Sequence, residues 1–399
     1  MSAATSGPLD AQIARHGSRI PRVLLFGEWE TSNLGDRAIL AGASEWLAQA
    51  GIEAVPMFFG ALRPTVPSQQ PPSTRGALTS VARGLRKVGP LLRIARGARA
   101  RRNVQRLVPL AEDAAAIVVG GGALLDGRDG HFLPSLAALA ALARTARRPL
   151  FCLGCGRTSD DVPVGREATV LKAFLRTCRF TAVRDPVTAA LLEPLAGHAL
   201  PVFGDFAFRG HLTRARPIGD AVLGVNVMRV EAGARKRYEE MVVTAVRAAA
   251  GFSRIVVFTT GDPDDGVIAT TLVASMRSAT NCTVVLPGSS EELRDVIARC
   301  SVIIASRLHA AVLALDEGVR VVDANPDGKI ASFFSSLSAE PITDLASEAV
   351  GQPITVSTGS RPSPSRVTAI TEVRERALSM LATLIVDPPA AGGSAVSET

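Results

Sequence analysis

A basic pair at the start of a helix is the feature of this sequence that points most directly to chemistry. The apolar run 302–304 predicts a strand, and Leu308–Asp316 predicts the helix that follows it. Arg307 and His309 are therefore expected at the first turn of a helix, at the carboxyl end of a parallel strand. Free amides and the helix dipole favour anions there, and a guanidinium adds a bidentate contact. Lys329, in the next loop, is expected to reach the same crevice, so the pattern favours an anionic ligand over a structural histidine.

Two loops of the first half contain glycines but do not match a dinucleotide-binding fingerprint. Residues 27–40, GEWETSNLGDRAIL, follow the apolar strand 23–26 with three acids and no Gly-x-Gly motif. Gly120–Gly122 follow a second strand, where backbone amides can approach a ligand closely. Leu125, however, stands where the fingerprint requires its last glycine. The triplet therefore indicates either a ligand-binding loop or only a tight turn between a strand and a helix.

The net charge of +7 is concentrated in one segment. No acidic residue lies between Glu53 and Glu112, and this window contains eleven Arg and Lys residues. Over 78–96, basic residues separate apolar positions at helical spacing, as in a solvated helix face or a helix on an anionic membrane. Aromatic residues for base stacking are missing, so we expect no nucleic-acid partner. We expect the basic insertion, residues 63–106, to bring the protein to an anionic membrane surface.

Cysteine usage and the absence of long apolar segments are typical of a reducing, cytoplasmic setting. The five cysteines form no repeated ligand pattern, and CLGC, residues 152–155, lacks a second pair that would complete a zinc site. The N-terminus has no apolar core of a secretory signal. The longest apolar stretch, 132–143, is well short of the ~20 residues of a membrane helix. We expect buried thiols, no metal, and a cytoplasmic protein that is peripheral at the inner face of the cell membrane.

Alternation of short β-branched runs with helix-length segments predicts an α/β fold with parallel sheets. The length of 399 residues allows two cores, because single cores stop growing near ~250–300 residues. Besides 23–26, the predicted strands lie near Ile117, Phe151, Ala182, Leu223, Val256, Val284, Ile303 and Val321. The predicted parts are a flexible segment (1–18), a first domain with the basic insertion (19–210), a second domain (211–345), a linker and C-terminal helix (346–386) and a disordered tail (387–399).

Six motifs occur in the order, and at about the spacing, seen in one enzyme family. They are SNLGDRAIL, VVGGGALLD, LGCGRTSDD, AVRDPVTAALL, GDFAF and ASRLHAAVLALDEGVRVV. From about Val23 to Phe334 the chain thus resembles the polysaccharide pyruvyl transferases, most specifically at Asn33–Asp36 and Arg307–His309. The resemblance implies a GT-B-like fold, with two Rossmann-like domains facing a central cleft. It also implies transfer of pyruvate from phosphoenolpyruvate to a sugar as a cyclic ketal, without a metal or nicotinamide cofactor.

The resemblance also implies roles for individual residues. Phosphoenolpyruvate carries a phosphate and a carboxylate, and it is expected on Arg307 and His309 with Arg184 as a third basic contact. The alternative for Arg184 is an ion pair with its neighbour or a helix cap. The acidic first loop is expected to face the hydroxyl-rich acceptor, a glycan or lipid-linked saccharide. His309 is the candidate acid and Asp36 or Asp126 the candidate base, with the N-cap of the first helix as the alternative for Asp36. The remaining expected substrate contacts are Glu28, Asn33, Gly35, Gly121, Gly122, Leu308 and Lys329.

Two other classes of protein stay open at this point. A GT-B glycosyltransferase would use the same architecture with a nucleotide-sugar donor, and a scaffold of an envelope-polysaccharide complex would need no donor. Stabilisation by phosphoenolpyruvate, by nucleoside diphosphates or by neither would separate the three. The sequence predicts neither the acceptor sugar, the bridged hydroxyls nor the oligomeric state.

Overall fold

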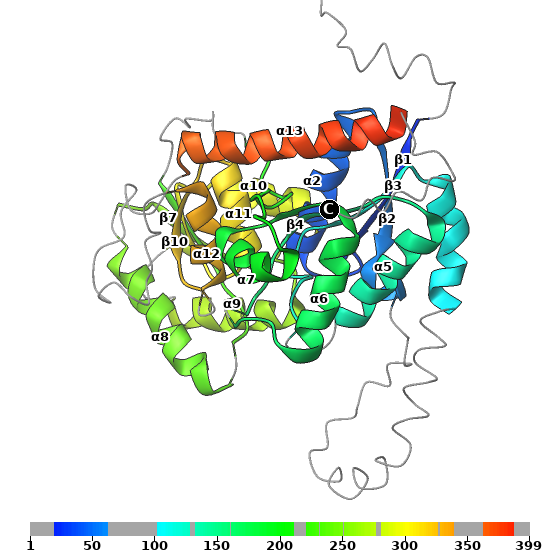
Figure 1. Ribbon diagram of the computed structural model, residues 1–399. Helices are drawn as coiled ribbons and strands as arrows, with labels where there is room; N and C mark the ends of the chain where they lie inside the picture. The colour runs from blue at the N-terminus through cyan, green and yellow to red at the C-terminus, as the bar shows by residue number, and fades with distance from the viewer. Residues whose placement is uncertain are drawn as a thin grey trace, which may run out of the picture.

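The computed structural model describes residues 20–62, 102–127, 132–159, 161–210, 221–230, 232–249, 251–276, 281–325, 328–338 and 362–386 (Figure 1). These residues form two parallel five-stranded sheets with helices packed against them. The predicted α/β fold with parallel sheets is therefore confirmed. The amphipathic stretch 78–96, the segment 1–18 and the tail 387–399 lie outside the described residues.

The first sheet has the strand order β2-β1-β3-β4-β5. Its strands are β1 (Arg22–Gly27), β2 (Glu53–Phe58), β3 (Ala116–Gly120), β4 (Leu150–Cys155) and β5 (Cys178–Val183), and its helices are α2 (Leu34–Ala48), η1 (Phe59–Leu62), α5 (Leu133–Ala146), α6 (Gly165–Thr177), α7 (Pro186–Ala196) and one over 102–113. Alternate residues of β1 face opposite sides: Val23 and Leu25 join one apolar cluster, and Leu24 and Phe26 join another. Because both faces are covered, the strand is a continuous apolar run.

One strand of this sheet, β2, is missing from the sequence prediction. Its sequence EAVPMF has Pro56 inside it and no fully buried position. β2 lies at the end of the sheet beside β1, where a missing N–H need not interrupt a ladder. Because Pro56 interrupts it, β2 lacks the β-branched run by which the sequence predicts the other strands, so the pattern does not detect this one.

The second sheet has the strand order β10-β9-β6-β7-β8. Its strands are β6 (Val222–Asn226), β7 (Arg254–Phe258), β8 (Cys282–Val285), β9 (Val302–Ala305) and β10 (Arg320–Asp323), and its helices are α8 (Ala232–Ala248), α9 (Pro263–Met276), α10 (Ser290–Ala298), α11 (Leu308–Asp316) and α12 (Lys329–Leu337). Each strand that the sequence predicts is present, and α11 has the predicted bounds. The two sheets lie on either side of the domain boundary predicted between residues 210 and 211.

Each sheet has one point where the strand order reverses. The reversal falls between β1 and β3 in the first sheet and between β6 and β9 in the second. In open parallel sheets, ligands bind beyond the carboxyl ends of the strands at such points. The acidic loop follows β1, the glycine triplet ends β3, and Arg307 and His309 follow β9. The topology therefore places all three sequence motifs at the end of the sheets where open parallel sheets commonly bind ligands.

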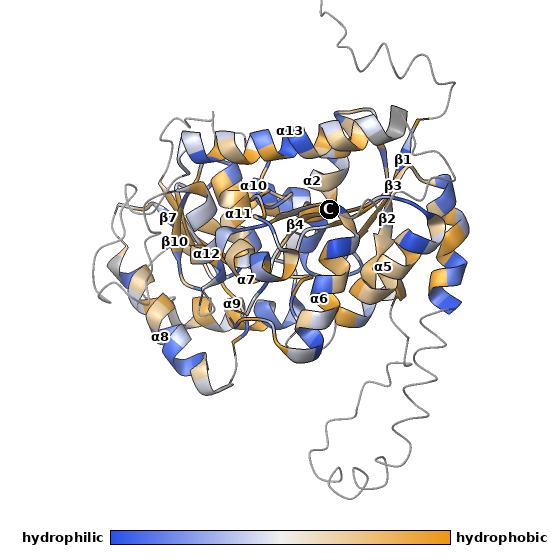
Figure 2. Ribbon diagram, in the orientation of Figure 1, coloured by the Kyte–Doolittle hydropathy of each residue, from blue (hydrophilic) through white to orange (hydrophobic). Residues whose placement is uncertain are grey.

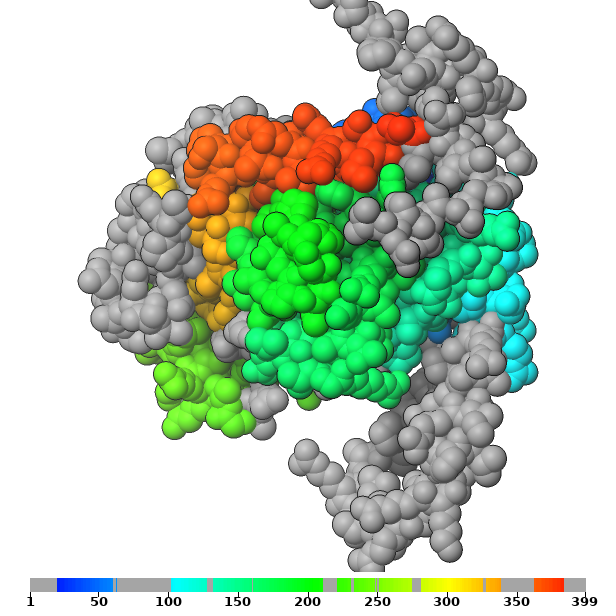
Figure 3. Space-filling model, in the orientation of Figure 1, coloured from blue at the N-terminus to red at the C-terminus, as the bar shows by residue number. Residues whose placement is uncertain are grey.

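The C-terminal helix α13 (Pro364–Val386) joins the two halves of the molecule. In Figure 1 it runs across both halves, and Figure 3 shows it as a continuous band on that face. One apolar cluster contains Val23 of β1, Leu313 of α11 and Ala377 of α13, so the core continues between the sheets. Figure 2 shows apolar residues on the central strands and polar residues along outer helices such as α8. The predicted C-terminal helix is confirmed.

Candidate active site

The turn between β9 and α11 is held by asparagines from the neighbouring strands. The N–H of Arg307 donates to Oδ1 of Asn226, at the end of β6, at 2.9 Å. Asn325, after β10, donates through Nδ2 to the carbonyl of Ser306 at 2.6 Å. The hydroxyls of Ser306 and Tyr238 are 2.6 Å apart. Since every residue of α11 but His309 is buried, the start of this helix has a fixed position.

The guanidinium of Arg307 is paired with two carboxylates of the loop after β7 and the start of α9. Its Nε atom is 2.7 Å from Oδ2 of Asp265, and its Nη2 atom is 3.1 Å from Oδ2 of Asp262. Burial acts to lower the pKa of Arg307, but the hydrogen bond and charge of Asp265, with those of Asp262, leave the pKa raised. Asp265 is fully buried, whereas the Asp262 side chain is 39% exposed. An incoming anion would therefore displace Asp262 more easily than Asp265.

The first turn of α2 shows that the capping alternative for Asp36 is wrong. The N-cap is Asn33, whose side-chain Oδ1 accepts from the N–H of Gly35 at 3.0 Å. Asp36 follows inside the first turn of the helix. The N–H of Leu34 donates to the carbonyl of Thr260, in the second domain, at 2.7 Å. Asp36 is therefore free of the capping role and lies close to the second domain.

The motifs Asn33–Asp36 and Arg307–His309 contact each other where the two domains meet. A Cβ atom added to Gly35 would overlap the ring of His309, so only glycine allows this approach. Nδ1 of His309 is 3.9 Å from Oδ1 of Asp36. On the other side of the ring, Nε2 is 3.8 Å from Oδ2 of Asp205. A histidine thus stands between two carboxylates, at the junction of both sheets.

Asp36 has the electrostatic environment of a proton-transferring group. Burial raises its pKa above the usual value, and the nearby carboxylate of Asp205 acts in the same direction. The charges of His309 and Arg307 and the hydrogen bond with Asn33 act to lower the pKa but do not cancel the rise. A carboxyl group with a raised pKa in a partly open site is a candidate general base.

Asp205 was not among the residues that sequence reasoning selected. It belongs to the GDFAF motif, residues 204–208, in the segment after α7. The motif carries no chemical signal of its own, because an acid beside glycine and aromatic residues fits many turns. The fold reveals its position, since Asp205 reaches His309 from a loop that lies between the two sheets in the sequence.

Arg184 makes the contacts that its structural alternative predicts. Its side chain is buried at the end of β5, with Nε 3.1 Å from Oδ2 of Asp185. Its Nη2 atom donates to the carbonyl of Arg157 at 3.3 Å. Asp185 also caps α7 by accepting from the N–H of Thr188 at 2.8 Å. The pair therefore fixes the loop after β5.

The glycine triplet forms a tight turn. Gly121 and Gly122 have φ values of 72° and 68°, which favour glycine. The N–H of Gly121 donates to the carbonyl of Leu153 at 3.1 Å, and the carbonyl of Gly122 accepts from Gly156 at 2.8 Å. A side chain at Gly121 would also overlap Ile39 of α2. Backbone geometry and helix packing therefore account for these glycines.

The other predicted site residues lie after strands or at the starts of helices in the two domains. Asp126 accepts from the N–H and hydroxyl of Thr158, within the first domain. Glu28 is half-buried directly after β1, and Lys329 is half-buried at the start of α12. The Leu308 side chain belongs to the apolar core, so this residue can meet a ligand only through its backbone.

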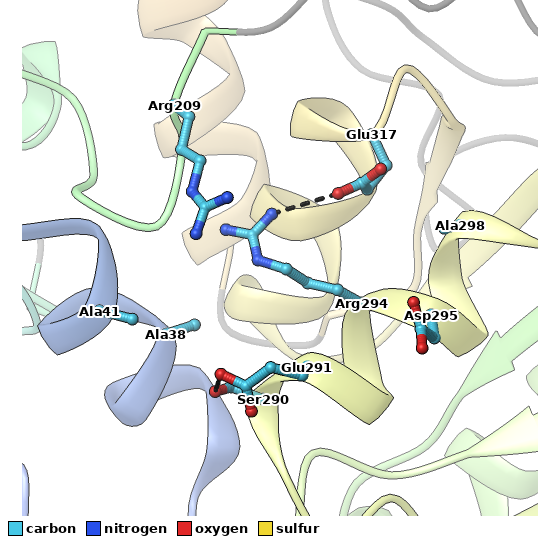
Figure 4. A pocket seen from close by; sticks show the side chains of 9 residues that line it. All are labelled: Ala38, Ala41, Arg209, Ser290, Glu291, Arg294, Asp295, Ala298 and Glu317. Atoms are coloured by element: carbon cyan, nitrogen blue, oxygen red, sulfur yellow. Dashed lines mark hydrogen bonds and ion pairs between the residues drawn. The ribbon is translucent and has the colours of Figure 1, made fainter. Parts of the chain in front are cut away.

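A polar cavity of about 300 Å³ lies between α2 and α10, away from His309 (Figure 4). Its arginines are already paired: Arg294 contacts Glu317 at 3.4 Å and Asp316 at 2.8 Å, and Arg209 contacts Glu45 at 3.0 Å. Because each of these cations already has a carboxylate partner, the cavity offers no obvious anion site. The candidate site is therefore the junction of α2 and α11, where Asp36 and His309 face each other.

Within the described residues, no group of three or more His, Cys, Asp or Glu side chains could hold a metal ion. The predicted buried thiols are confirmed for Cys152 and Cys155 in β4. Among the same described parts of the chain, no helix has both the length and the apolar content needed to cross a membrane.

Comparison with known proteins gives one family and a set of distant structures. The model of the polysaccharide pyruvyl transferase family matches residues 33–322. HepE of Anabaena, crystallised in complex with UDP-glucose, is 12% identical, with a TM-score of 0.44 and coverage of 92% of each chain. MurG of Acinetobacter baumannii is 13% identical, with a TM-score of 0.45 and coverage of 92% of this chain and 99% of MurG. UDP-GlcNAc 2-epimerase of Methanocaldococcus jannaschii is 12% identical, with a TM-score of 0.46 and coverage of 88% and 91%. No curated protein sequence matches the chain.

Proposed function

We propose that this chain, which belongs to the polysaccharide pyruvyl transferase family, transfers pyruvate from phosphoenolpyruvate to a sugar of a cell-envelope polysaccharide or glycolipid. The product would be a cyclic pyruvate ketal. The observation that carries the proposal is the meeting of Asn33–Asp36 with Arg307–His309 at the domain junction. One loop offers a carboxylate to hydroxyl groups, and the other offers cations to a phosphate and a carboxylate.

The donor site is proposed at the start of α11. The Arg307 guanidinium would exchange its contact with the partly exposed Asp262 for an anionic group of phosphoenolpyruvate while keeping Asp265. Lys329, at the start of α12, would supply a second cation from the next loop. Arg184 would contribute by shaping the loop after β5, since its guanidinium is engaged with Asp185.

The proposed reaction needs one proton donor and one proton acceptor. The first sugar hydroxyl oxygen bonds to C2 of phosphoenolpyruvate and loses its proton to Asp36, while His309 gives a proton to C3, which becomes the methyl group. The second hydroxyl oxygen then bonds to C2 as the bond from C2 to the phosphate oxygen breaks. The second hydroxyl proton restores His309, and the proton on Asp36 leaves with phosphate. The products are the ketal and inorganic phosphate.

A melting-temperature measurement with two ligands, phosphoenolpyruvate and UDP, tests the donor assignment. Phosphoenolpyruvate at about 100 times its Kd should stabilise the folded protein by about 2.7 kcal/mol, whereas UDP should not. Release of phosphate from phosphoenolpyruvate in the presence of lipid-linked or free glycans then tests the reaction. Stabilisation by UDP alone would favour a nucleotide-sugar enzyme, and stabilisation by neither ligand would favour a non-catalytic scaffold.

The basic insertion is proposed to hold the enzyme at an anionic membrane, where a lipid-linked acceptor would lie. Each Lys or Arg near such a surface contributes about 1 kcal/mol, so half of the eleven basic residues would be enough for reversible binding. Sedimentation with anionic vesicles should detect binding that weakens as salt is raised. Replacing residues 72–102 by a short Gly/Ser linker should abolish it, and an intact protein left in the supernatant at low salt would exclude this role.

A further inference from the structure

The carboxylate of Asp205 faces His309 from the side opposite Asp36. Asp205 is fully buried, and its Oδ1 atom accepts from the N–H of Ala207 at 2.9 Å. Its Oδ2 atom and Nε2 of His309 are both buried and lack a hydrogen-bond partner among the described residues. These two atoms lie 3.8 Å apart. Buried polar atoms that face each other unpaired are costly, and a small rotation of the ring would join them.

The two carboxylates beside the ring differ in their access to a substrate. The Asp36 side chain is 22% exposed, whereas that of Asp205 is fully buried. The His309 side chain is itself 12% exposed. A substrate can therefore approach the ring from the Asp36 side, next to Nδ1, but not from the Asp205 side, next to Nε2.

The loop that carries Asp205 is held by a single arginine of α13. The Arg374 guanidinium donates to three backbone carbonyls, those of Phe203 at 3.1 Å, Phe208 at 2.7 Å and Asp205 itself at 2.6 Å. The guanidinium also lies over the Phe203 ring, 5.1 Å from its centroid. Because the three carbonyls span residues 203–208, one side chain fixes the whole turn. The position of Asp205 thus depends on the C-terminal helix.

We propose that Asp205 is a positioning residue that accepts a hydrogen bond from Nε2–H of His309 and so presents Nδ1 to Asp36 and the substrate. The inference deepens the proposed function, because it assigns the ring nitrogen that exchanges the proton. A histidine with one nitrogen bound to a carboxylate has a fixed tautomer and a fixed ring orientation. Arg374 supports this arrangement by holding the Asp205 backbone.

The charges around the His309 ring agree with the proposal that Asp205 holds Nε2 while Nδ1 faces Asp36 and the substrate. Asp36 of α2 and Asp205 of the 203–208 turn face the two ring nitrogens. Arg307, the N-cap residue of α11, adds a positive charge that acts on Asp36. From α13, the positive charge of Arg374 interacts with Asp205. When His309 gives up its proton through Nδ1, Asp205 retains the proton on Nε2 by accepting its hydrogen bond, and Nδ1 then accepts the second hydroxyl proton.

Nitrogen-15 NMR of the ligand-free protein tests the tautomer without any assay of activity. The sequence has five histidines, so loss of one ring signal in His309→Asn identifies the ring. The neutral His309 ring should carry its proton on Nε2 in the wild type. In Asp205→Asn, whose amide can donate to Nε2, the proton should move to Nδ1. A neutral wild-type ring protonated on Nδ1 would overturn the proposal, and this result would stand whether or not the protein transfers pyruvate.

Kinetics with phosphoenolpyruvate and an accepted glycan provide the second readout. Asp205→Asn should lower kcat by about 100-fold or more and alter the pH dependence of kcat, with KM for phosphoenolpyruvate within about two-fold of the wild type. Asp205→Glu, which keeps the charge, should recover part of kcat. Arg376→Ala serves as a control, because Arg376 also lies on α13 but stacks on Phe180. An unchanged kcat and pH profile in Asp205→Asn would refute the positioning role.

Discussion

The loops before α2 and α11 occupy equivalent places in their sheets but differ in the backbone N–H groups that they leave available for a ligand. Each follows a central strand at the reversal of strand order. At α2, the Asn33 side chain accepts a hydrogen bond from the N–H of Gly35, and the carbonyl of Thr260 accepts one from the N–H of Leu34. At α11, the N-cap residue Arg307 makes no side-chain cap. The start of α11 is thus the better anion site, whereas α2 contributes a carboxylate.

This comparison explains why the first loop of a Rossmann-like domain is acidic. The first N–H groups of α2 already donate to the Asn33 side chain and to the Thr260 carbonyl of the second domain. A phosphate is therefore not required to accept hydrogen bonds from these groups. Gly35 brings the helix against His309, and Asp36 then reaches the ring. In the proposed function, two domains of the same architecture therefore take different roles, because the residues at their loops differ in charge.

The largest fall in kcat should come from removing the imidazole ring of His309, which lies at the start of α11 and faces Asp36 of α2. His309→Asn retains a polar group near Nδ1 but cannot deliver a proton as the imidazolium does. We expect kcat to fall by about 10³-fold, with binding of phosphoenolpyruvate kept within a few-fold. His198→Asn is the control, because His198 is exposed in the turn after α7 and should have wild-type kinetics. Comparable activity of the two variants would remove His309 from the mechanism.

Substitution of Asp36 in the acidic loop should lower kcat less than His309→Asn does, and it should leave phosphoenolpyruvate binding unchanged. Asp36→Asn keeps the shape of the side chain but removes the proton acceptor, so kcat should fall by about 100-fold. Glu45→Gln, on the same helix, should leave the rate unchanged, because Glu45 pairs with Arg209 instead. If Asp36→Asn weakened phosphoenolpyruvate binding and kept kcat, the division of roles between the two loops would be reversed.

The raised pKa of Asp36 makes a prediction about stability with a definite sign. Burial penalises the ionised carboxylate in the folded state, so stability is lost as pH rises from the ordinary value of 3.8 through the raised folded pKa. Asp36→Asn should therefore melt at the same or a higher temperature than the wild type at pH 7. The difference should vanish below that ordinary pKa. A clear loss of stability at pH 7 would indicate a structural role for the carboxylate.

The smallest effect should come from substituting Asp262, whose carboxylate competes with phosphoenolpyruvate for the Arg307 guanidinium. Asp262→Asn removes the partly exposed partner, so phosphoenolpyruvate should bind about three- to ten-fold more tightly. Asp264→Asn is the matched control, since Asp264 pairs with Arg229. Titration calorimetry compares the two variants. Equal affinities for both would mean that Asp262 does not limit access to the guanidinium.

Much of the fold could be predicted because the central strands are buried on both faces. Their continuous apolar runs, and the helix Leu308–Asp316, follow directly from the sequence. The edge strand β2 could not be predicted in this way, because Pro56 and partial exposure hide it. Local patterns therefore predict the strands that keep an uninterrupted β-branched run, including the partly exposed edge strand β8, and miss the strand that a proline interrupts.

The site was only partly predictable, because its members come from distant parts of the chain. Asp36 and Arg307 stand out by type and position, but the capping residue proved to be Asn33. The pairing of Arg307 with Asp262 and Asp265, from the loop after β7 and the start of α9, has no sequence signal. The role proposed for Asp205 depends on α13, the last described helix. Such contacts are set by the packing of the two domains.

The pairing of Arg307 also decides how the donor site is best tested. Alanine would leave the buried Asp265 carboxylate without its cation and lower stability for reasons unrelated to binding. Glutamine is preferable, because its amide can still donate to Asp265. Arg235→Gln is the charge-matched control, since Arg235 pairs with Glu239 on the outer surface of α8.

Titration calorimetry with phosphoenolpyruvate is the measurement that tests the central claim most directly. The wild type, Arg235→Gln and Asp36→Asn should bind it with similar Kd values, whereas Arg307→Gln should bind at least about 100-fold more weakly. This result would place the donor site on the second domain and show that Asp36 of the first domain is not needed to bind the donor. Wild-type affinity in Arg307→Gln, or no binding of phosphoenolpyruvate by the wild type, would contradict the account.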